Sequence, residues 1–233
     1  MLEIKNINKS FGNLQVLKDI SLTIGKGEIA AIVGPSGAGK TTLLQIAGTL
    51  EKPDSGSVIF NGTELIGMKD KRLSAFRNTN MGFVFQFHQL LPEFTAQENV
   101  ALPALIAGES KKKAMEKAAD LLLQLGLSER MHHKPAAMSG GERQRTAIAR
   151  ALINDPEIIF ADEPTGSLDS ANRQEIQDIF ADLRDQLGQT VVMVTHDSSL
   201  AAIADRVIEM ADGRVLPPTP SLPVVDTLDP GGD

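Results

Sequence analysis

A glycine-rich segment near the amino terminus has the residue types of a phosphate-binding loop, or P-loop. It follows the apolar run from Ile29 to Val33 and leads into a predicted helix from about Lys40 to Gly48. Glycines allow successive backbone N–H groups to point at phosphate oxygens, and the amino terminus of a helix adds the positive end of its dipole. Lys40 would then reach the β- and γ-phosphates of a nucleotide, while the hydroxyl of Thr41 would bind Mg²⁺. The candidate nucleotide-binding residues of this segment are Gly34, Pro35, Ser36, Gly37, Ala38, Gly39, Lys40, Thr41 and Thr42.

Two consecutive carboxylates, Asp162 and Glu163, end a second apolar run that begins at Ile158. We therefore expect them at the carboxyl edge of a buried strand, which is where open α/β sheets bind ligands. Beside a P-loop, the first carboxylate would hold Mg²⁺ and the second would orient and polarise an attacking water. Without the P-loop, the same pair would be interpreted as a solvated corner.

A third candidate site begins a predicted helix at Ser139. Ser139 and Glu142 have the spacing of a capping box, which alone indicates a well-capped structural helix. A cap does not require Gly140 and Gly141 between them, and glycines lower helix stability. We interpret them as a place where a ligand approaches the backbone at a helix amino terminus, a second anion site without a P-loop of its own. The predicted apolar face of this helix is Ala147, Ile148, Ala151 and Leu152.

The elements that must position these segments indicate an α/β fold. In chain order, the patterns predict strands at 2–9, 17–24 and 28–33, a helix at 40–48, a strand at 57–60, a mainly helical block at 72–154, a strand from 158, a helix at 170–187 and a strand at 190–195. The later strands are short and β-branched, which is typical of strands buried on both faces of a mostly parallel sheet.

The overall composition excludes several classes of protein. The chain has 233 residues, of which 42% are hydrophobic and 23% charged, as in an ordinary soluble globular protein. Its formal net charge of −7 disfavours a nucleic-acid partner. The absence of Cys excludes disulfides, thiolate metal sites and a cysteine nucleophile. No apolar stretch approaches the ~20 residues that span a bilayer, and the amino terminus lacks a signal-peptide core, so we expect a cytoplasmic chain unless a partner holds it at a membrane.

We expect a single domain over residues 1–216. Its core is predicted at about 1–86 and 155–216, with an inserted helical subdomain at about 87–154. Residues 217–233 are rich in Pro and poor in large apolar residues, so we predict a flexible tail that can be removed without loss of the fold. No internal repeat is present, which excludes solenoids and propellers.

Together, the three candidate segments resemble the nucleotide-binding subunit of ABC transporters, and the resemblance covers the chain to about Leu216. Met138 differs from the Leu that usually precedes the signature Ser, a volume-conserving change. The resemblance implies a P-loop NTPase fold: a RecA-like core with an antiparallel β subdomain and an inserted α-helical signature subdomain. It also implies an ATPase that uses ATP and Mg²⁺. Two chains would pair head to tail, with each ATP between the P-loop of one chain and the signature Ser and glycines of the other.

The same resemblance assigns roles to further residues. Phe11 resembles the aromatic residue that stacks on adenine, and Asp169 belongs to a loop that crosses the dimer interface. Gln86, after the apolar stretch 82–85, resembles the glutamine that contacts Mg²⁺ or water and relays the nucleotide state to the membrane subunit. His196 resembles the switch histidine that contacts the γ-phosphate and steadies Glu163. The implied catalytic residues are Glu163, His196 and Gln86; the implied metal ligands are Thr41, Gln86 and Asp162; and the implied signature residues are Ser139, Gly140, Gly141 and Glu142.

Two segments, 161–166 and 85–100, are most similar to the lipoprotein-releasing branch of the family, which is related to macrolide exporters and a cell-division member. The second segment resembles the one that docks the coupling helix of the membrane subunits. Its apolar residues could form a receiving groove or could pack inside the helical subdomain. Those residues are Phe87, Leu90, Leu91, Pro92 and Phe94.

The implied partners are a second copy of the chain and separate integral-membrane permease subunits, with no nucleic acid and no direct contact with the transported substrate. The implied location is the cytoplasmic face of the bacterial inner membrane, as a peripheral subunit. The expected role is release of lipoproteins towards the outer membrane, and a macrolide-type exporter or a cell-division complex is the alternative.

Three other classes of nucleotide-binding protein fit less well. A DNA-repair or chromosome-organising ATPase would insert a long coiled coil between Lys40 and Ser139, but no heptads occur there. A translation-factor ATPase would carry two such cassettes in one chain. A small-molecule P-loop kinase would explain Lys40 and Asp162 but not the segment 139–144.

Overall fold

The structure, a computed structural model, describes residues 1–217, so the tail predicted at 217–233 lies outside the described residues except for Pro217. The strands are β1 (Leu2–Phe11), β2 (Leu14–Ile24), β3 (Ile29–Val33), β4 (Ser55–Phe60), β5 (Thr63–Glu64), β6 (Met81–Phe85), β7 (Ile158–Asp162), β8 (Thr190–Val194), β9 (Arg206–Ala211) and β10 (Arg214–Val215). The helices are α1 (Lys40–Ala47), α2 (Asp70–Asn80), α3 (Ala96–Ile106), α4 (Lys111–Gln124), α5 (Gly140–Leu152), α6 (Ser170–Leu187) and α7 (Ser198–Ala201), with short 3₁₀ turns at Ser128–Arg130 and Pro135–Ala137.

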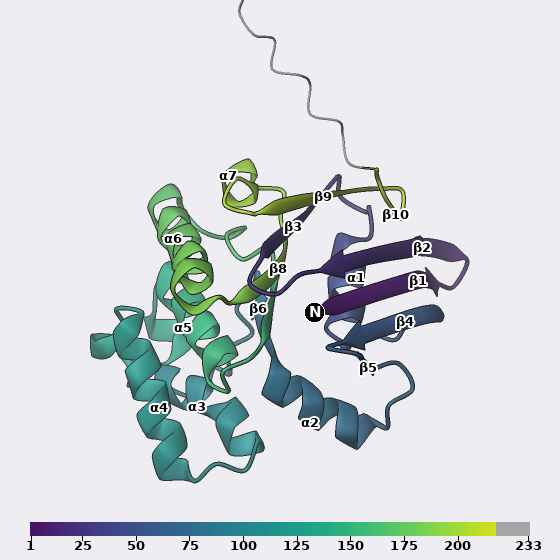
Figure 1. The fold of residues 1–233 in the computed structure, drawn as a ribbon. Helices are drawn as coiled ribbons and strands as arrows, with labels where there is room; N and C mark the ends of the chain where they lie inside the picture. The colour runs from purple at the N-terminus through teal and green to yellow at the C-terminus, as the bar shows by residue number, and fades with distance from the viewer. Residues whose placement is uncertain (218–233) are drawn as a thin grey trace, which may run out of the picture.

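The strands form two sheets with helix α1 between them (Figure 1). The larger sheet has six strands in the order β10-β9-β3-β8-β7-β6, and all neighbours except β10 and β9 run parallel. The smaller sheet has four antiparallel strands in the order β2-β1-β4-β5. This is the expected α/β core with an antiparallel β subdomain. Because the central strands are parallel, the loops that follow β3, β7 and β8 emerge at one edge.

Apolar side chains bury both faces of the parallel sheet. On β3, Ala30 and Ile32 point into the core shared with α1 and the antiparallel sheet, where Leu43 and Phe60 also lie. The intervening residues of β3 enter a second core on the opposite face, which includes Phe180 of α6. Alternate residues of one strand thus hold helices on both faces, as the continuous apolar run indicates. Both cores fix the edge from which the P-loop emerges.

Helices α3, α4 and α5, here called the helical cluster, gather on the side of the molecule away from the antiparallel sheet (Figure 1). They enclose a third core that includes Ala104, Leu122 and Met138, and they lie within the block predicted to be helical. Helix α5 joins this core to the sheet, because Ala149 packs inside the cluster and Ile148 packs against the sheet. Helix α5 therefore belongs to both cores.

The structure contains several elements that the sequence does not predict, the short β5 and α7 among them. Strand β6 interrupts the block predicted as helical at 72–154, where it pairs with β7 from Met81–Ile158 to Phe85–Asp162. Strands β9 and β10 were not predicted from the sequence, although β9 pairs in parallel with β3. Within residues 1–217, no helix combines the length and the apolar character needed to cross a membrane.

Candidate functional site

A cavity of about 580 Å³ lies at the edge of the sheet where β3, β7 and β8 end. The residues that line it come from β2, the P-loop, the start of α1 and the segments after β7 and β8. They are Leu14, Val16, Gly34, Ser36, Gly37, Gly39, Lys40, Thr41, Thr42, Glu163 and His196. The structure therefore brings together most of the predicted P-loop residues and both catalytic candidates that follow the strands. Leu14 and Val16 were missed by the sequence analysis, because only the fold of β2 shows that it runs beside the P-loop.

The P-loop has the backbone that anion binding requires. Gly34, Gly37 and Gly39 all have positive φ values, of 146°, 79° and 96°, a region that favours glycine. The amide of Ala38 donates to the carbonyl of Pro35 at 3.2 Å, which closes the loop before α1 begins at Lys40. Residues 34–39 thus curl around the amino terminus of a helix whose first N–H groups have no partner within the helix.

Lys40 and Thr41 connect the P-loop to its surroundings. Lys40 is largely buried, and its Nζ donates to the carbonyls of Gly34 at 2.9 Å and Pro35 at 3.0 Å, so the ammonium lies inside the curl of the loop. The hydroxyl of Thr41 donates to Oδ1 of Asp162 at 3.0 Å. Burial raises the pKa of Asp162 above its ordinary value, and the adjacent charge of Glu163 adds to that rise. A cation at this carboxylate would therefore offset an unfavourable burial of charge.

Glu163 is held in a strained and fully specified position. Its φ of 47° lies in the left-handed region, and its amide donates to the carbonyl of Val194 at 2.9 Å. Oε2 of Glu163 accepts from the His196 amide at 3.3 Å and lies 2.8 Å from Nδ1 of the His196 ring. The strand ends of β7 and β8 thus fix one carboxylate at the mouth of the cavity, and His196 orients it.

Gln86 lies next to this group because β6 pairs with β7. The loop after Glu163 passes so close that a Cβ added to Gly166 would lie 2.9 Å from Nε2 of Gln86. In addition, the hydroxyl of Ser167 donates to the carbonyl of Gln86 at 3.2 Å. The predicted glutamine is therefore in contact with the segment that follows the two carboxylates, although it does not line the cavity itself.

The signature residues form a capped helix start. Ser139 accepts from the Glu142 amide at 3.2 Å, and Glu142 accepts from the Ser139 amide at 2.7 Å, so both halves of the capping box are present. The backbone hydrogen bond from Ser139 holds the pKa of Glu142 below its ordinary value. Among the described residues that line the cavity, none belongs to 139–142. Within one chain, the P-loop and the start of the signature helix, the two candidate anion-binding elements, are therefore separate.

The close packing of helix α6 requires glycine at position 141, a cause that the sequence does not indicate. A Cβ at Gly141 would lie 1.8 Å from Oδ1 of Asn172, in the first turn of α6. Asn172 is held there by Asp169, whose carboxylate accepts from the Asn172 amide at 2.9 Å and from its side chain at 2.8 Å. The hydrogen bond from the Asn172 backbone amide lowers the pKa of Asp169 most, and the bond from the Asn172 side chain lowers it further. Close packing by α6 thus explains Gly141, whereas Gly140 meets only a methyl group of Leu168 at 3.3 Å.

Phe11 ends β1 and is half-exposed. The Nζ of Lys9 lies 5.0 Å from the centroid of its ring, a cation–π distance, and also donates to Glu51 and to the carbonyl of Lys52. Phe11 does not line the cavity, but it pairs with Leu14 of β2, which does. Its exposed ring remains a candidate for base stacking.

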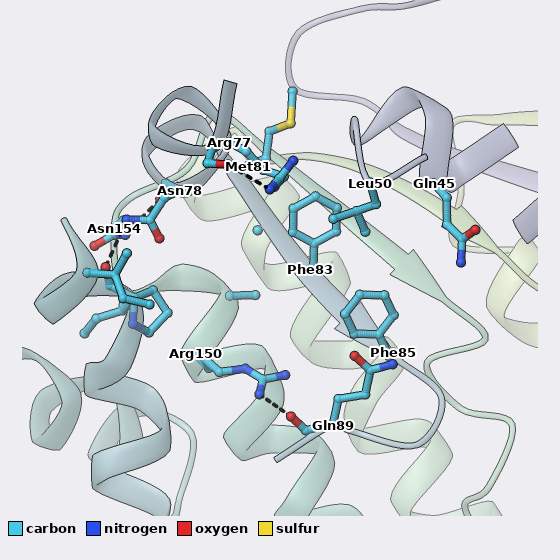
Figure 2. A pocket seen from close by; sticks show the side chains of 16 residues that line it. Gln45, Leu50, Arg77, Asn78, Met81, Phe83, Phe85, Gln89, Arg150 and Asn154 are labelled. Carbon is cyan, nitrogen blue, oxygen red and sulfur yellow. Dashed lines mark hydrogen bonds between the residues drawn. The ribbon is translucent and has the colours of Figure 1, made fainter. Parts of the chain in front are cut away.

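A second cavity, here called the groove, has a volume of about 620 Å³ and lies between α2, β6, α3 and α5. Figure 2 shows the rings of Phe83 and Phe85 side by side along β6, with Leu50 next to Phe83 and with Arg77 and Arg150 at the walls. The two rings stack with centroids 6.1 Å apart. No Asp or Glu occurs among the described residues that line the groove, so it offers an apolar floor with two cationic walls. Of the segment 85–100 that the sequence indicates for docking, only Phe85 and Gln89 line the groove, and the other lining residues come from outside that segment.

One prediction follows from the P-loop backbone. A Cβ at Gly34 would lie 2.1 Å from the backbone carbonyl oxygen of Met210 on β9. Gly34→Ala must therefore displace either the strand or the start of the P-loop, and we expect at least a 10-fold loss of affinity for a nucleoside triphosphate, or about 1.4 kcal/mol. Isothermal titration calorimetry with a non-hydrolysable nucleotide measures this loss.

The matched control for Gly34→Ala is Gly62→Ala. Gly62 also has a positive φ, 78°, but a Cβ there meets nothing within 4 Å. We expect Gly62→Ala to cost about 1–2 kcal/mol of folding free energy and to leave nucleotide affinity unchanged. Equal affinities for Gly34→Ala and the parent chain would contradict the proposed role of the P-loop backbone.

Comparison with known proteins agrees with this geometry. The model of the ABC transporter family matches residues 17–166. The lipoprotein-releasing system ATP-binding protein LolD of Bacteroides thetaiotaomicron is 62% identical over 215 residues, which cover 92% of this chain and 99% of that protein. LolD of Porphyromonas gingivalis is 56% identical over 213 residues, which cover 91% of this chain and 97% of that protein.

A solved structure gives the same fold. The ATP-binding cassette MJ0796, in a dimeric post-hydrolysis state bound to ADP and Pi, is 40% identical to this chain with a TM-score of 0.86. The match covers 93% of this chain and 97% of that one. The β strands, the helical cluster and the separate signature helix described above therefore have a counterpart in a dimer that holds nucleotide.

Proposed function

Because this chain belongs to the ABC transporter family of ATP-binding proteins, we propose that it is the ATP-hydrolysing subunit of a membrane complex that releases lipoproteins from the inner membrane. The observation that carries the proposal is the 62% identity to a lipoprotein-releasing ATP-binding protein over 99% of that protein's length. The assembly we propose contains two copies of the chain and separate integral-membrane permease subunits. The chain would lie on the cytoplasmic face of the inner membrane as a peripheral subunit.

ATP fits the cavity between the P-loop and the strand ends. The backbone amides of residues 34–39 would bind phosphate oxygens, and Lys40 would exchange its bonds to the Gly34 and Pro35 carbonyls for the β- and γ-phosphates. Phe11 would stack on adenine, and its ring already carries the Lys9 ammonium against it. Each of these residues binds and orients the nucleotide, and none of them reacts with it.

The proposed metal ligands are Thr41, Asp162 and Gln86, which offer the oxygen atoms that Mg²⁺ prefers. The fit rests on the pairing of the Thr41 hydroxyl with a half-buried Asp162 carboxylate whose pKa is raised by burial. Mg²⁺, when bound, neutralises charge on the phosphate oxygens.

Glu163 is the proposed group that orients and polarises the attacking water. His196 holds the Glu163 carboxylate by a hydrogen bond from its backbone amide and by the close approach of its ring, which supports a role in fixing the direction of that carboxylate. The partner chain would add Ser139, Gly140, Gly141 and the rest of its signature helix, whose amino terminus stabilises negative charge on the γ-phosphate. The separation of the signature from the cavity within one chain supports a site that two chains complete, and Asp169 would lie at their interface.

Lipoprotein release is tested by reconstitution. The chain, its permease subunits and an acylated lipoprotein are placed in proteoliposomes, ATP is added, and lipoprotein transferred to a soluble carrier is measured. We expect transfer that requires ATP. Continued ATP hydrolysis with all lipoprotein retained in the bilayer would remove lipoprotein release and leave the ATPase assignment in place.

The groove is the proposed docking site for the permease subunits. It combines an apolar floor with exposed apolar residues at its rim, namely Leu50 and Ile106, which are 44% and 69% exposed. An amphipathic helix laid into such a groove would bury this apolar area. The absence of acidic residues among its described lining favours an occupant that carries carboxylates beside its apolar face.

We expect Ile106→Lys to reduce recovery of the permease subunits by about 10-fold or more, because it removes an apolar contact from the rim of the groove and would bury an ammonium against the apolar face of the docked helix. Recovery is measured by quantitative affinity purification of the co-expressed complex. Leu123→Lys is the control, because Leu123 is 61% exposed on α4 and does not line the groove. Equal recovery with both variants would place the permease elsewhere.

A further inference from the structure

The segment between β6 and α3, residues 86–95, here called the docking loop, has neither helix nor strand along its length. It presents three exposed apolar side chains to solvent, those of Phe87, Leu91 and Phe94. A loop with exposed rings and no regular structure would ordinarily be mobile. In this protein, however, two side chains of the helical cluster bind its backbone.

The first of these side chains is Arg150 of α5. Its guanidinium donates to the carbonyl of Gln89 at 2.6 Å through Nη1 and to the carbonyl of His88 at 2.8 Å through Nη2, and Figure 2 shows the arm reaching across to Gln89. Both His88 and Gln89 have positive φ values, 61° and 49°. Two successive non-glycine residues in this region persist only where the surroundings hold them. Because the guanidinium fork bonds both carbonyls at once, Arg150 supplies that constraint.

The second side chain is Asn99 of α3, which is 1% exposed. Its Oδ1 accepts from the Leu91 amide at 2.7 Å, and its Nδ2 donates to the carbonyls of Leu91 at 3.1 Å, Phe94 at 3.2 Å and Thr95 at 2.9 Å. One buried amide thus bonds four backbone atoms in the second half of the loop. Asn99 and Arg150 together hold residues 88–95 from the two helices of the cluster that flank them.

The beginning of the loop is attached to a different part of the molecule. Gln86 accepts at its carbonyl from Ser167 and lies against Gly166, in the segment that follows the carboxylates of the ATP site. The loop therefore has one end on the ATP site and the rest on the helical cluster. A movement between these two parts would therefore change the backbone of the loop at Gln86 and Phe87.

We propose that Arg150 and Asn99 are positioning residues that fasten residues 88–95 to the helical cluster, so that the docking loop and the cluster move as one rigid body and bend only at Gln86–Phe87. The fastening itself follows from the hydrogen bonds of this chain alone. Its purpose rests on the proposed function: a rigid loop passes the movement of the signature helix to the membrane subunit, whereas a loose loop would dissipate it.

The absence of cysteine from the chain makes a direct test possible. Cysteines are placed at two exposed positions, Glu93 in the loop and Asp120 on α4, and carry nitroxide labels whose separation is measured by pulsed electron paramagnetic resonance. We expect a single narrow distance distribution in the parent chain. In the double variant Arg150→Met with Asn99→Ala, we expect the distribution to become at least twice as wide.

Two matched variants control for general loosening of the helices. Arg145→Met removes an arginine from the same helix α5, but this arginine pairs with Glu175 of α6. Gln97→Ala removes an amide from the same helix α3, but this amide donates to the carbonyl of Met115 at 2.9 Å. Narrow distributions in both controls support the proposal, whereas broadening equal to that of the double variant would overturn it. An unchanged width in the double variant would overturn it as well.

A conservative variant covers the case in which the double variant fails to fold. Asn99→Asp keeps the volume and the acceptor for the Leu91 amide but cannot donate to the three carbonyls, so we expect broadening near residues 91–95 with a native circular dichroism spectrum. A narrow distribution in Asn99→Asp would contradict the role of Asn99. These distances need no permease, and they decide the fastening even if reconstituted complexes release no lipoprotein.

The purpose of the fastening has its own readout. In reconstituted complexes, we expect the double variant to hydrolyse several-fold more ATP per lipoprotein released, since hydrolysis continues while less movement reaches the membrane subunit. A merely structural defect would lower hydrolysis and release in proportion. An unchanged ratio, together with a broadened loop, would remove the transmission role.

Discussion

Glu163→Gln is expected to reduce ATP turnover by roughly 10²–10⁴-fold while ATP binding is retained. Glutamine has nearly the same shape as glutamate, so the left-handed backbone at this position and the bond from its amide to Val194 are preserved. The side-chain amide of glutamine, however, accepts the proton of an attacking water far more weakly than the carboxylate of glutamate does. The nucleotide contacts lie in the P-loop, which this substitution does not touch. Steady-state phosphate release and equilibrium binding of ATP measure the two effects separately.

The control for this experiment is Glu116→Gln, an identical chemical change on an exposed part of α4, where only a weak ion pair with Lys112 at 3.9 Å is lost. We expect parental turnover from it. Undiminished turnover in Glu163→Gln would remove Glu163 from the proposed role. Loss of ATP binding in parallel with turnover would instead mean that the substitution disturbs the cavity rather than the chemistry.

The local part of this site could be predicted from the sequence because its signals are contiguous. Strand β3, the glycine-rich loop and α1 follow one another without interruption, and each has a pattern of its own. The same holds for the capping box of Ser139 and Glu142, since a side chain that caps its own helix needs no distant partner. These elements begin within two residues of their predicted positions.

The parts that were missed depend on long-range pairing. Strand β6 has only five residues between two helices, and it becomes a strand because it pairs with β7. The same pairing places Gln86, which follows β6, beside Glu163, which follows β7. Strand β9 has an alternating burial pattern with an exposed Arg206 and Glu209, so its sequence lacks the apolar run that predicted β3. The clash that makes Gly141 necessary is made by Asn172, on another helix. Spacing along the chain contains none of this information.

The groove shows the same limit for function. The resemblance to the lipoprotein-releasing branch places docking in residues 85–100, and the apolar residues crowded there are a second, weaker indication. The structure adds Leu50, Arg77 and Arg150 from three other segments, and it buries Asn99 of the predicted stretch as a support for the loop. Some residues of 85–100 therefore face outward and others hold the loop in place. The number of apolar residues in the segment does not distinguish the two groups.

Mixing two inactive variants is expected to restore ATP turnover, because each site would be built from the P-loop of one chain and the signature of the other. Lys40→Ala removes the ammonium that lies inside the P-loop. Gly140→Asp places a carboxylate at the first residue of α5, where a helix tolerates an acid but an approaching γ-phosphate is repelled. Its Cβ would meet only the end of the Leu168 side chain at 3.3 Å, so the fold is kept. Each variant alone has two defective sites per dimer.

In a mixed head-to-tail dimer, both defects fall in one site and the other site is intact. Random assortment makes half of the dimers mixed, so equimolar mixing should recover up to about a quarter of the parental turnover at saturating ATP. A site completed within a single chain would give no recovery, since every chain in the mixture would carry a defect in its own site. Turnover equal to the sum of the two variants alone would therefore show that the signature acts on the P-loop of its own chain. A recovery that appears only when both variants are present identifies the separated signature helix as the missing part of its partner's site.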